Sequence, residues 1–473
     1  MVGLLGALLA LGGLIWCAYR GWSVIVLAPI AALVAALFAV EAPLLATYTQ
    51  IYMPALGRFI VAFFPLFLLG AIFGRLMEDV GAARGLADAV VARLGPRRAI
   101  LATVLACALL TYGGVSLFVV AFAVYPLANA LFRAGDVPKR LLPASIALGA
   151  FTFTMTALPG TPAIQNAIPM PFFGTTPFAA PGIGVLAALV MAGGGLWWLR
   201  RCAARAHARG EGYGAEEDDD ERGPEAPRLG DAPPSAPSAD PPPLWFALAP
   251  ILLVIGLNYA LSVHLFPALD ADYLAEPAYG AVDIDAVRGV WAIIVALSTA
   301  IALLLLAGRG RLSDPKTSVV EGAEASIRPL FNTASLVGFG AVVAGLPAFD
   351  LVRAAVAGAS SDPVVGLAIS ASVLAGLTGS ASGGMTIALD ALGADALAAA
   401  RAEGVSPELL HRVTTLATGG LDALPHNGAV VTLLAICGLG HREAYGPVFA
   451  VAVAIPVLAL LVALLLGSAF GAF

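Results

Sequence analysis

Apolar runs of about the length of a membrane span recur along the chain, separated by short polar stretches. A helix that crosses the hydrocarbon core of a bilayer needs roughly 20 apolar residues. The runs that meet or approach this length are 2–19, 23–40, 59–77, 141–168, 178–199, 244–265, 290–307, 329–349, 412–437 and 446–470. The pattern therefore predicts an all-α integral membrane protein with about ten transmembrane helices in the lipid bilayer.

Two further apolar stretches, 99–131 and 364–397, are too long for one span and too interrupted for two. Small and polar residues break each stretch in its middle, TYGGVS at 111–116 and TGSASGG at 378–384. Non-helical backbone at membrane depth is tolerated only where protein or a water-filled cavity covers it. Each stretch is therefore predicted to be a re-entrant hairpin, in which two short half-helices meet at a tip inside the membrane.

The distribution of basic residues predicts the orientation. If both chain ends lie outside and each hairpin returns to its own side, 20 of the 25 lysine and arginine residues fall in cytoplasmic segments, as the positive-inside rule requires. Arg412 is counted in an outer segment in this layout. The first apolar run has no basic residue before it, so it is expected to be an uncleaved span rather than a signal peptide.

A polar segment, 200–243, divides the chain. It holds EEDDDE at 216–221 and a proline-rich stretch, which predicts a disordered cytoplasmic linker, with a docking tail as the alternative. The halves on either side, 1–199 and 244–473, each contain three spans, a hairpin, an interrupted span and a last span. Five crossings is an odd number, so the second half is expected to enter the membrane upside down, in the inverted-topology repeats of secondary transporters.

Composition supports a membrane chain, because 60% of the residues are apolar and only 12% are charged, half the fraction typical of soluble domains. The net charge of −6 argues against a nucleic-acid partner. The histidines and cysteines have no metal-binding spacing, so neither a metal nor a cofactor is expected.

Four polar clusters lie at membrane depth: the two hairpin tips and the interruptions at 157–166 and 419–428. A single Gly-Pro break is usually a kink, but four breaks at corresponding positions of two halves indicate a transport site. No lysine or arginine lies in the middle of a predicted span. An anion would then be held by helix N-termini, hydroxyl groups and the amides of Gln165, Asn166 and Asn427.

Asp422 and His426 are the ionisable pair inside a predicted span. Such residues are costly in a membrane and usually functional, and histidine titrates near neutral pH. We therefore predict that they carry a coupling proton. The alternative is a structural role, in which hydrogen bonds from these side chains tie the unwound segment together.

At these clusters the sequence resembles the gluconate permease (GntP) family of carboxylate carriers. The matching stretches are LMEDVGAARGLADAVVARLGPRRA (76–99), LLTYGGVSLFVVAFAVYPLA (109–128), ALGAFTFTMTALPGTPAIQNAIP (147–169), LAGLTGSASGGMTIALDALG (374–393) and GGLDALPHNGAVVTLL (419–434). The resemblance implies a homodimer in the bacterial inner membrane that takes up small hydroxy-carboxylates with protons.

The resemblance also implies the substrate-contacting residues, by position. They are Gly113, Gly114, Val115, Ser116, Gly160, Thr161, Gln165, Asn166, Thr378, Gly379, Ser380, Ala381, Ser382, Gly383, Gly384, His426, Asn427 and Gly428. Related sodium-coupled carriers have Ser-Asn-Thr tips, which this sequence lacks.

The sequence thus predicts a proton-coupled symporter, not an enzyme, for a 3-hydroxybutyrate-like or gluconate-like substrate. The alternatives are a sodium-coupled, citrate-like carrier and a carboxylate channel. An intramembrane hydrolase built on Asp422, His426 and Ser380 or Ser116 is disfavoured, because no G-x-S-x-G or H-E-x-x-H motif occurs.

Overall fold

A computed structural model describes residues 2–20, 22–39, 42–115, 117–214, 242–347, 360, 362–425 and 427–473. Helices dominate these residues, and no strand occurs among them. The prediction of an all-α fold is confirmed. Most of the predicted linker lies outside the described residues, but its first residues continue the helix α12 (Pro181–His207), because arginine and alanine are good helix formers.

Six continuous helices are long and apolar enough to cross a membrane, judged by length and composition over the described residues. Three of them are the single helices α12, α14 (Ile284–Ala307) and α15 (Pro315–Ala344). The other three contain a π-helical turn. They combine α3 (Leu44–Thr47), η1 (Tyr48–Tyr52) and α4 (Met53–Asp79); α13 (Leu244–Tyr259), η5 (Ala260–Leu265) and η6 (Phe266–Ala268); and α21 (His441–Phe449), η9 (Ala450–Ala454) and α22 (Ile455–Phe470).

The other four predicted spans are short or broken. α1 (Val2–Tyr19) and α2 (Val24–Phe38) are continuous but short. The predicted span 141–168 divides into α8 (Leu142–Ala150), α9 (Phe153–Thr156) and α10 (Ile164–Ala167), and α11 (Pro169–Phe173) follows it. The predicted span 412–437 divides into α19 (Pro407–Leu421) and α20 (Gly428–Ile436). Both interruptions thus fall where Gly and Pro predicted them.

The two predicted hairpins are helix pairs that pack on each other, α6 (Ala99–Tyr112) with α7 (Leu117–Ala134) and α17 (Pro363–Thr378) with α18 (Ala381–Ala402). Gly114 and Gly379 turn the chain at the tips with φ of +96° and +60°, a region that only glycine enters without strain. The expectation of short half-helices is wrong for α18, which has 22 residues, because its alanine-rich end continues the helix.

An additional helix, α5 (Ala82–Leu94), precedes the first hairpin and was not predicted as an element. It meets the next helical stretch, Pro96–Tyr112, at an angle of 102°. The remaining short helical turns are η2 (Pro96–Arg98), η3 (Lys139–Leu141), η7 (Asp272–Ala275) and η8 (Pro277–Tyr279).

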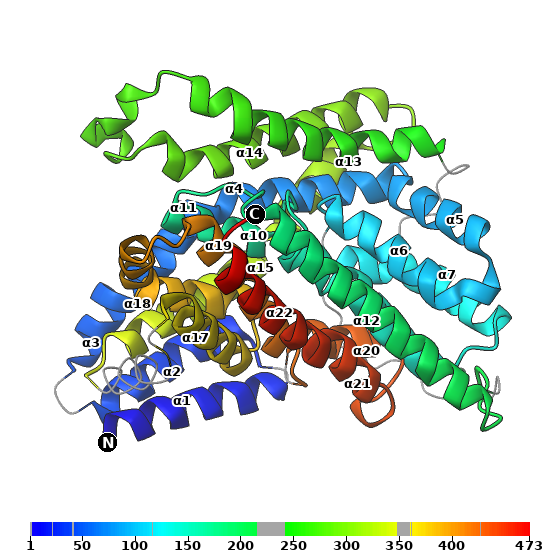
Figure 1. Cartoon of the computed structure of the whole chain (residues 1–473), viewed down its shortest axis with the longest axis horizontal. Helices are drawn as coiled ribbons and strands as arrows, with labels where there is room; N and C mark the ends of the chain where they lie inside the picture. The colour runs from blue at the N-terminus through cyan, green and yellow to red at the C-terminus, as the bar shows by residue number, and fades with distance from the viewer. Residues whose placement is uncertain are drawn as a thin grey trace.

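The same packing pairs occur in both halves of the chain. α1 packs on α2 and α13 on α14, α6 packs on α8 and α17 on α19, and α2 meets α15 as α14 meets α4. α4 also packs along α15, and α12 along α22. Figure 1 shows the α1–α2 pair along the lower edge and the α13–α14 pair along the upper edge, with the other helices between them.

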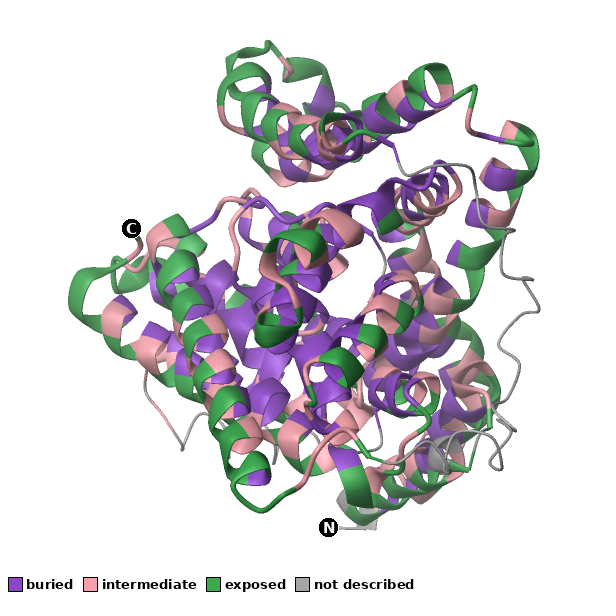
Figure 2. Cartoon of the chain, turned by 90° about the vertical axis from the view of Figure 1, so that its right-hand side faces the viewer, coloured by how far each residue is buried: buried purple, intermediate pink, exposed green. Residues whose placement is uncertain are grey.

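Buried residues concentrate in the centre of the bundle, below the α13–α14 pair (Figure 2). Large apolar side chains remain exposed on the outside, among them Leu45 (80%), Val61 (81%), Leu306 (78%) and Leu465 (70%). Exposed apolar surface on this scale is unfavourable in water but matches lipid tails. The outer surface therefore suits a bilayer.

Candidate functional site

The tip of the first hairpin touches the first broken span. The hydroxyl of Tyr112 donates a hydrogen bond to the Pro159 carbonyl at 2.7 Å. A Cβ atom on Gly114 would lie 3.1 Å from the Pro162 ring, so only a glycine fits this approach easily. Val115 is buried beside them, and Ser116 lies outside the described residues.

Side-chain amides hold the interruption of the first broken span in place. Asn166 Nδ2 donates to the Thr161 carbonyl at 3.1 Å and to the Pro177 carbonyl at 2.9 Å. The Gly160 N–H also donates to the Pro177 carbonyl, at 2.8 Å. Unwinding a helix frees backbone groups that must find new partners, and these contacts supply them.

Two polar groups beside this loop are buried without a hydrogen-bond partner, Gln165 Oε1 and Asn258 Oδ1. Asn258 reaches across from α13, where its Nδ2 donates to the Gly160 carbonyl at 3.4 Å. Buried unsatisfied acceptors are unusual in native proteins. These two are the candidates to receive a hydroxyl from a bound ligand.

Arg412 is fully buried beside the same loop. Its Nε and Nη2 donate to the Ala179 carbonyl at 3.0 and 2.8 Å, and Nη2 also donates to the Pro177 carbonyl at 3.3 Å. Its Nη1 donates to the Thr156 carbonyl at 3.3 Å and to Asn166 Oδ1 at 3.1 Å. All these acceptors are uncharged, and no ion pair found among the described residues includes Arg412.

Arg412, counted above in an outer segment, is buried inside a helix in the structure. Its helix, α19, begins earlier than predicted, at Pro407, after the N-cap Ser406, whose hydroxyl accepts the Glu408 N–H. Ser-Pro-Glu is a helix-start signal. Read from that signal, the sequence would have placed Arg412 in the second turn of the helix.

His411 is fully buried next to Arg412. Its Nδ1 lies 2.6 Å from Thr175 Oγ1, and its Nε2 lies 3.2 Å from Asn166 Oδ1. Thr415, one turn later, donates to the Thr156 carbonyl at 2.8 Å. His411, Arg412 and Thr415 of α19 therefore all make hydrogen bonds to residues in or beside the first interruption.

The second hairpin tip is held by its own hydroxyl groups. Ser380 caps α18 by accepting the Gly383 N–H at 3.1 Å, and Thr378 donates to the Leu374 carbonyl at 2.8 Å. The Ser382 hydroxyl lies 3.5 Å from those of Ser380 and Thr333. The tip thus presents the N-terminus of α18, which starts at Ala381 and is a favourable place for an anion.

The second broken span meets this tip. The carboxyl group of Asp422 lies next to the backbone N–H groups of Ala381 and Ala423. Asn427 Nδ2 donates to the Gly379 carbonyl at 2.9 Å, while its Oδ1 caps α20 by accepting the N–H groups of Ala429 and Val430. His426 lies outside the described residues.

Contacts between the halves bring the four clusters together. α10, in the first interruption, packs against α18, and α20, after the second interruption, packs against α7. The predicted residues of both tips and both interruptions therefore lie in one region, apart from Ser116 and His426, which are not described. The arrangement offers helix N-termini and neutral polar groups around a fixed positive charge.

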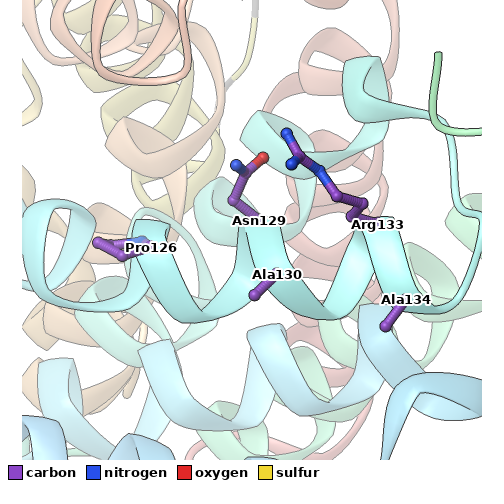
Figure 3. Close-up of a pocket in the computed structure, with 5 residues that line it drawn as sticks. All are labelled: Pro126, Asn129, Ala130, Arg133 and Ala134. Atoms are coloured by element: carbon purple, nitrogen blue, oxygen red, sulfur yellow. The ribbon is translucent and has the colours of Figure 1, made fainter. Parts of the chain in front are cut away.

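A shallow surface cavity of about 390 Å³ lies away from this region, on α7 (Figure 3). Pro126, Asn129, Ala130, Arg133 and Ala134 line it. None of the predicted site residues is among them.

Sequence reasoning missed three buried polar residues of the site: Asn258, His411 and Arg412. Asn258 carries a weak signal, since Ser262 follows it four residues later on the same helix face, inside an otherwise apolar run. His411 and Arg412 stand at the edge of an apolar run, where a hydropathy pattern cannot separate a loop from a buried helix turn.

No family model matches the chain. The uncharacterized transporter YxjC of Bacillus subtilis (strain 168) is 43% identical over 451 residues, which cover 94% of each of the two chains. The crystal structure of the YdaH transporter of Alcanivorax borkumensis, described as having an unusual topology, matches with a TM-score of 0.53 over 89% of both chains. Their sequence identity is 19%, so this match shows a shared fold alone. The chain therefore belongs to the family of the YxjC transporter and is a multi-pass membrane transporter.

Proposed function

We propose that the protein is a secondary active carrier that takes up a small hydroxy-carboxylate together with a proton. The substrate is a 3-hydroxybutyrate-like or gluconate-like acid, and the carrier is of the gluconate permease type. We further propose inverted-topology repeats, which the recurrence of the same helix pairs in both halves supports.

The observation that carries the proposal is the contact between Asp422 and the N-terminus of α18. The Asp422 carboxyl group lies next to the Ala381 N–H, and this N-terminus is also where a substrate carboxylate binds in our proposal. A helix N-terminus favours one negative charge, and two carboxylates at one position repel each other. Ionised Asp422 therefore competes with the substrate for the hairpin tip.

Protonation of Asp422 removes that competition. A neutral carboxyl group binds the N–H weakly, so the substrate carboxylate takes its place at the tip. Gln165 and Asn258 then accept hydrogen bonds from the substrate hydroxyl groups through their unpartnered oxygens. The proton binds before the substrate in this scheme, which couples the two.

The test is uptake of labelled 3-hydroxybutyrate, with gluconate and citrate as competitors, into proteoliposomes with an imposed pH gradient. The Asp422→Asn variant mimics the protonated side chain. We expect it to exchange substrate with a pH-independent KM and to lose accumulation driven by the pH gradient. Asp395→Asn, at an exposed position on α18, is the control and should accumulate substrate normally.

The same assay separates the rival functions. Uptake that requires sodium and does not depend on pH would mean that sodium, not the proton, is the coupling ion. Flux that never exceeds the gradient of the substrate would make the protein a channel. His426→Ala tests the second predicted proton carrier, and unchanged accumulation by this variant would remove His426 from the coupling scheme.

The location and assembly are proposals as well: the bacterial inner membrane, with both chain ends outside, and a homodimer. The first rests on the predicted charge distribution and the second on the family resemblance alone.

A further inference from the structure

The proposed function assigns no role to the buried guanidinium of Arg412. Burying a charge is costly unless partners compensate for it, and the described contacts of Arg412 are all to uncharged oxygens. An arginine stays protonated in proteins. The region around the first interruption therefore holds one positive charge in every step of a transport cycle.

All five N–H groups of Arg412 are used within the protein, so the guanidinium does not itself hold the substrate. It joins α19 to the first interruption, and Asp422 lies at the C-terminal end of the same helix. Ten residues of helix separate the two, roughly 15 Å along the axis. The fixed positive charge and the exchangeable negative charge therefore share one rigid element.

We infer that Arg412 is a positioning residue that sets the charge of the carrier so that both productive states are neutral. The inference rests on the proposed function. With Arg412 charged and Asp422 ionised, the empty site has no net charge. With Asp422 protonated and one substrate carboxylate bound, it again has none.

The two unproductive states are charged. Substrate without a proton leaves the site at −1, and a proton without substrate leaves it at +1. A charged site faces a far larger desolvation cost than a neutral one when it crosses an apolar barrier. Arg412 thus makes one proton per carboxylate the favoured stoichiometry, because only the empty and the fully loaded sites cross without a net charge.

Several other ionisable groups lie near the pair. Tyr112 and His411 lie beside Arg412, and His441 and Tyr445 contact the second interruption through the Pro425 and Ala423 carbonyls. The helices α9, α11, α17 and α22, which pack on α19, contain no ionisable side chain. On α18, Asp390 lies beside Arg58, and Asp395 is exposed. His426 lies outside the described residues.

Removal of the fixed charge changes which states of the site carry a net charge. Without it, the empty and fully loaded sites both carry −1, whereas the state with a proton and no substrate becomes neutral. Arg412→Gln should therefore exchange substrate slowly, because the empty and the fully loaded sites both carry a charge across the barrier. Arg412→Lys keeps the charge with fewer hydrogen bonds, so it should exchange substrate at close to the wild-type rate.

The experiment measures proton entry into proteoliposomes with an internal pH dye, with and without substrate, beside substrate exchange. We expect substrate exchange, and the proton entry that accompanies substrate, to be at least tenfold slower than wild type for Arg412→Gln and close to wild type for Arg412→Lys. Adding Asp422→Asn to Arg412→Gln should abolish the remaining proton entry, because the proton carrier is gone. Arg401→Gln, on an exposed residue of α18, is the control.

Asn166→Asp provides a second route that keeps the arginine, because it sets a carboxylate against Arg412 and should slow substrate exchange in the same way if Arg412→Gln fails to fold. Wild-type substrate exchange by a folded Arg412→Gln or Asn166→Asp variant would overturn the inference, as would equally slow exchange in the Gln and Lys variants of Arg412. The proposed function fails separately, if the wild-type protein accumulates no carboxylate under a pH gradient.

Discussion

The amide side chains at the two interruptions mostly make hydrogen bonds to backbone groups. Asn166 donates to two carbonyl oxygens and accepts from Arg412 and His411. Asn427 caps α20 and holds the Gly379 carbonyl. Residues predicted as ligands thus shape the site, and the groups left for a ligand are unpartnered oxygens and helix N-termini.

Asn427 allows the two roles of such an amide to be separated. Asn427→Ala loses both the cap and the bond to the hairpin tip, and loss of an N-cap costs about 1 kcal/mol. Asn427→Asp keeps the cap but cannot donate to the Gly379 carbonyl. We expect the alanine variant alone to have a clearly lower Tm in detergent, whereas both variants should transport poorly. Normal transport by Asn427→Asp would show that the bond to the tip is dispensable.

At the scale of elements, the second hairpin depends on the close approach of its two arms. A Cβ on Gly384 would lie 2.3 Å from the backbone nitrogen of Ala375. Gly384→Ala should therefore force α17 and α18 apart and destabilise the protein by about 1–3 kcal/mol, seen as a lower Tm. Gly70→Ala on α4 is the control, because its Cβ would meet open space, and it should not lower the Tm.

A salt bridge joins the segment after α12 to the start of the first broken span. Arg140 binds Glu211, with Nη2 2.9 Å from Oε2, and this hydrogen bond holds the pKa of Glu211 below its usual range. A pKa that is lower in the folded state stabilises the fold above the unfolded pKa of about 4.3. The contribution is lost as the pH falls through the folded pKa.

Glu211→Gln should therefore lower the Tm slightly at pH 7 and match the wild type near pH 3. The side chains are 34% and 39% exposed, so the difference should stay within about 1 kcal/mol. Glu276→Gln, at another exposed carboxylate, serves as the comparison. A difference that persists unchanged at low pH would exclude the salt bridge as its cause.

For the whole molecule, the proposed topology specifies which side of the membrane each loop faces. Our proposal places Tyr273 and Glu403 outside and Gly310 in the cytoplasm, because the second hairpin returns to its own side. Single cysteines at these positions, in a variant without the native cysteines, test this with a membrane-impermeant thiol reagent. We expect labelling of intact cells at 273 and 403 and not at 310. Labelling at 273 but not at 403 would mean that the hairpin crosses the membrane.

Hydropathy predicted the long apolar helices, and Gly and Pro predicted both interruptions, because a helix in a membrane must satisfy its backbone hydrogen bonds internally. The helix α5 was not predicted. Thr111 to Gly114 and Gly419 to Asp422 stand out in the sequence because runs of small and polar residues are rare inside apolar membrane segments.

Only the tertiary structure decided what those polar groups contact. Arg412 looked like a loop residue because its compensation comes from carbonyl oxygens at Thr156, Pro177 and Ala179, more than 200 residues away. Asp422 lies next to Ala381, at the N-terminus of a separate helix, α18. The hydropathy pattern of the sequence indicates which residues are polar at membrane depth. The partner of a buried charge depends instead on how helices that are distant in the sequence pack together.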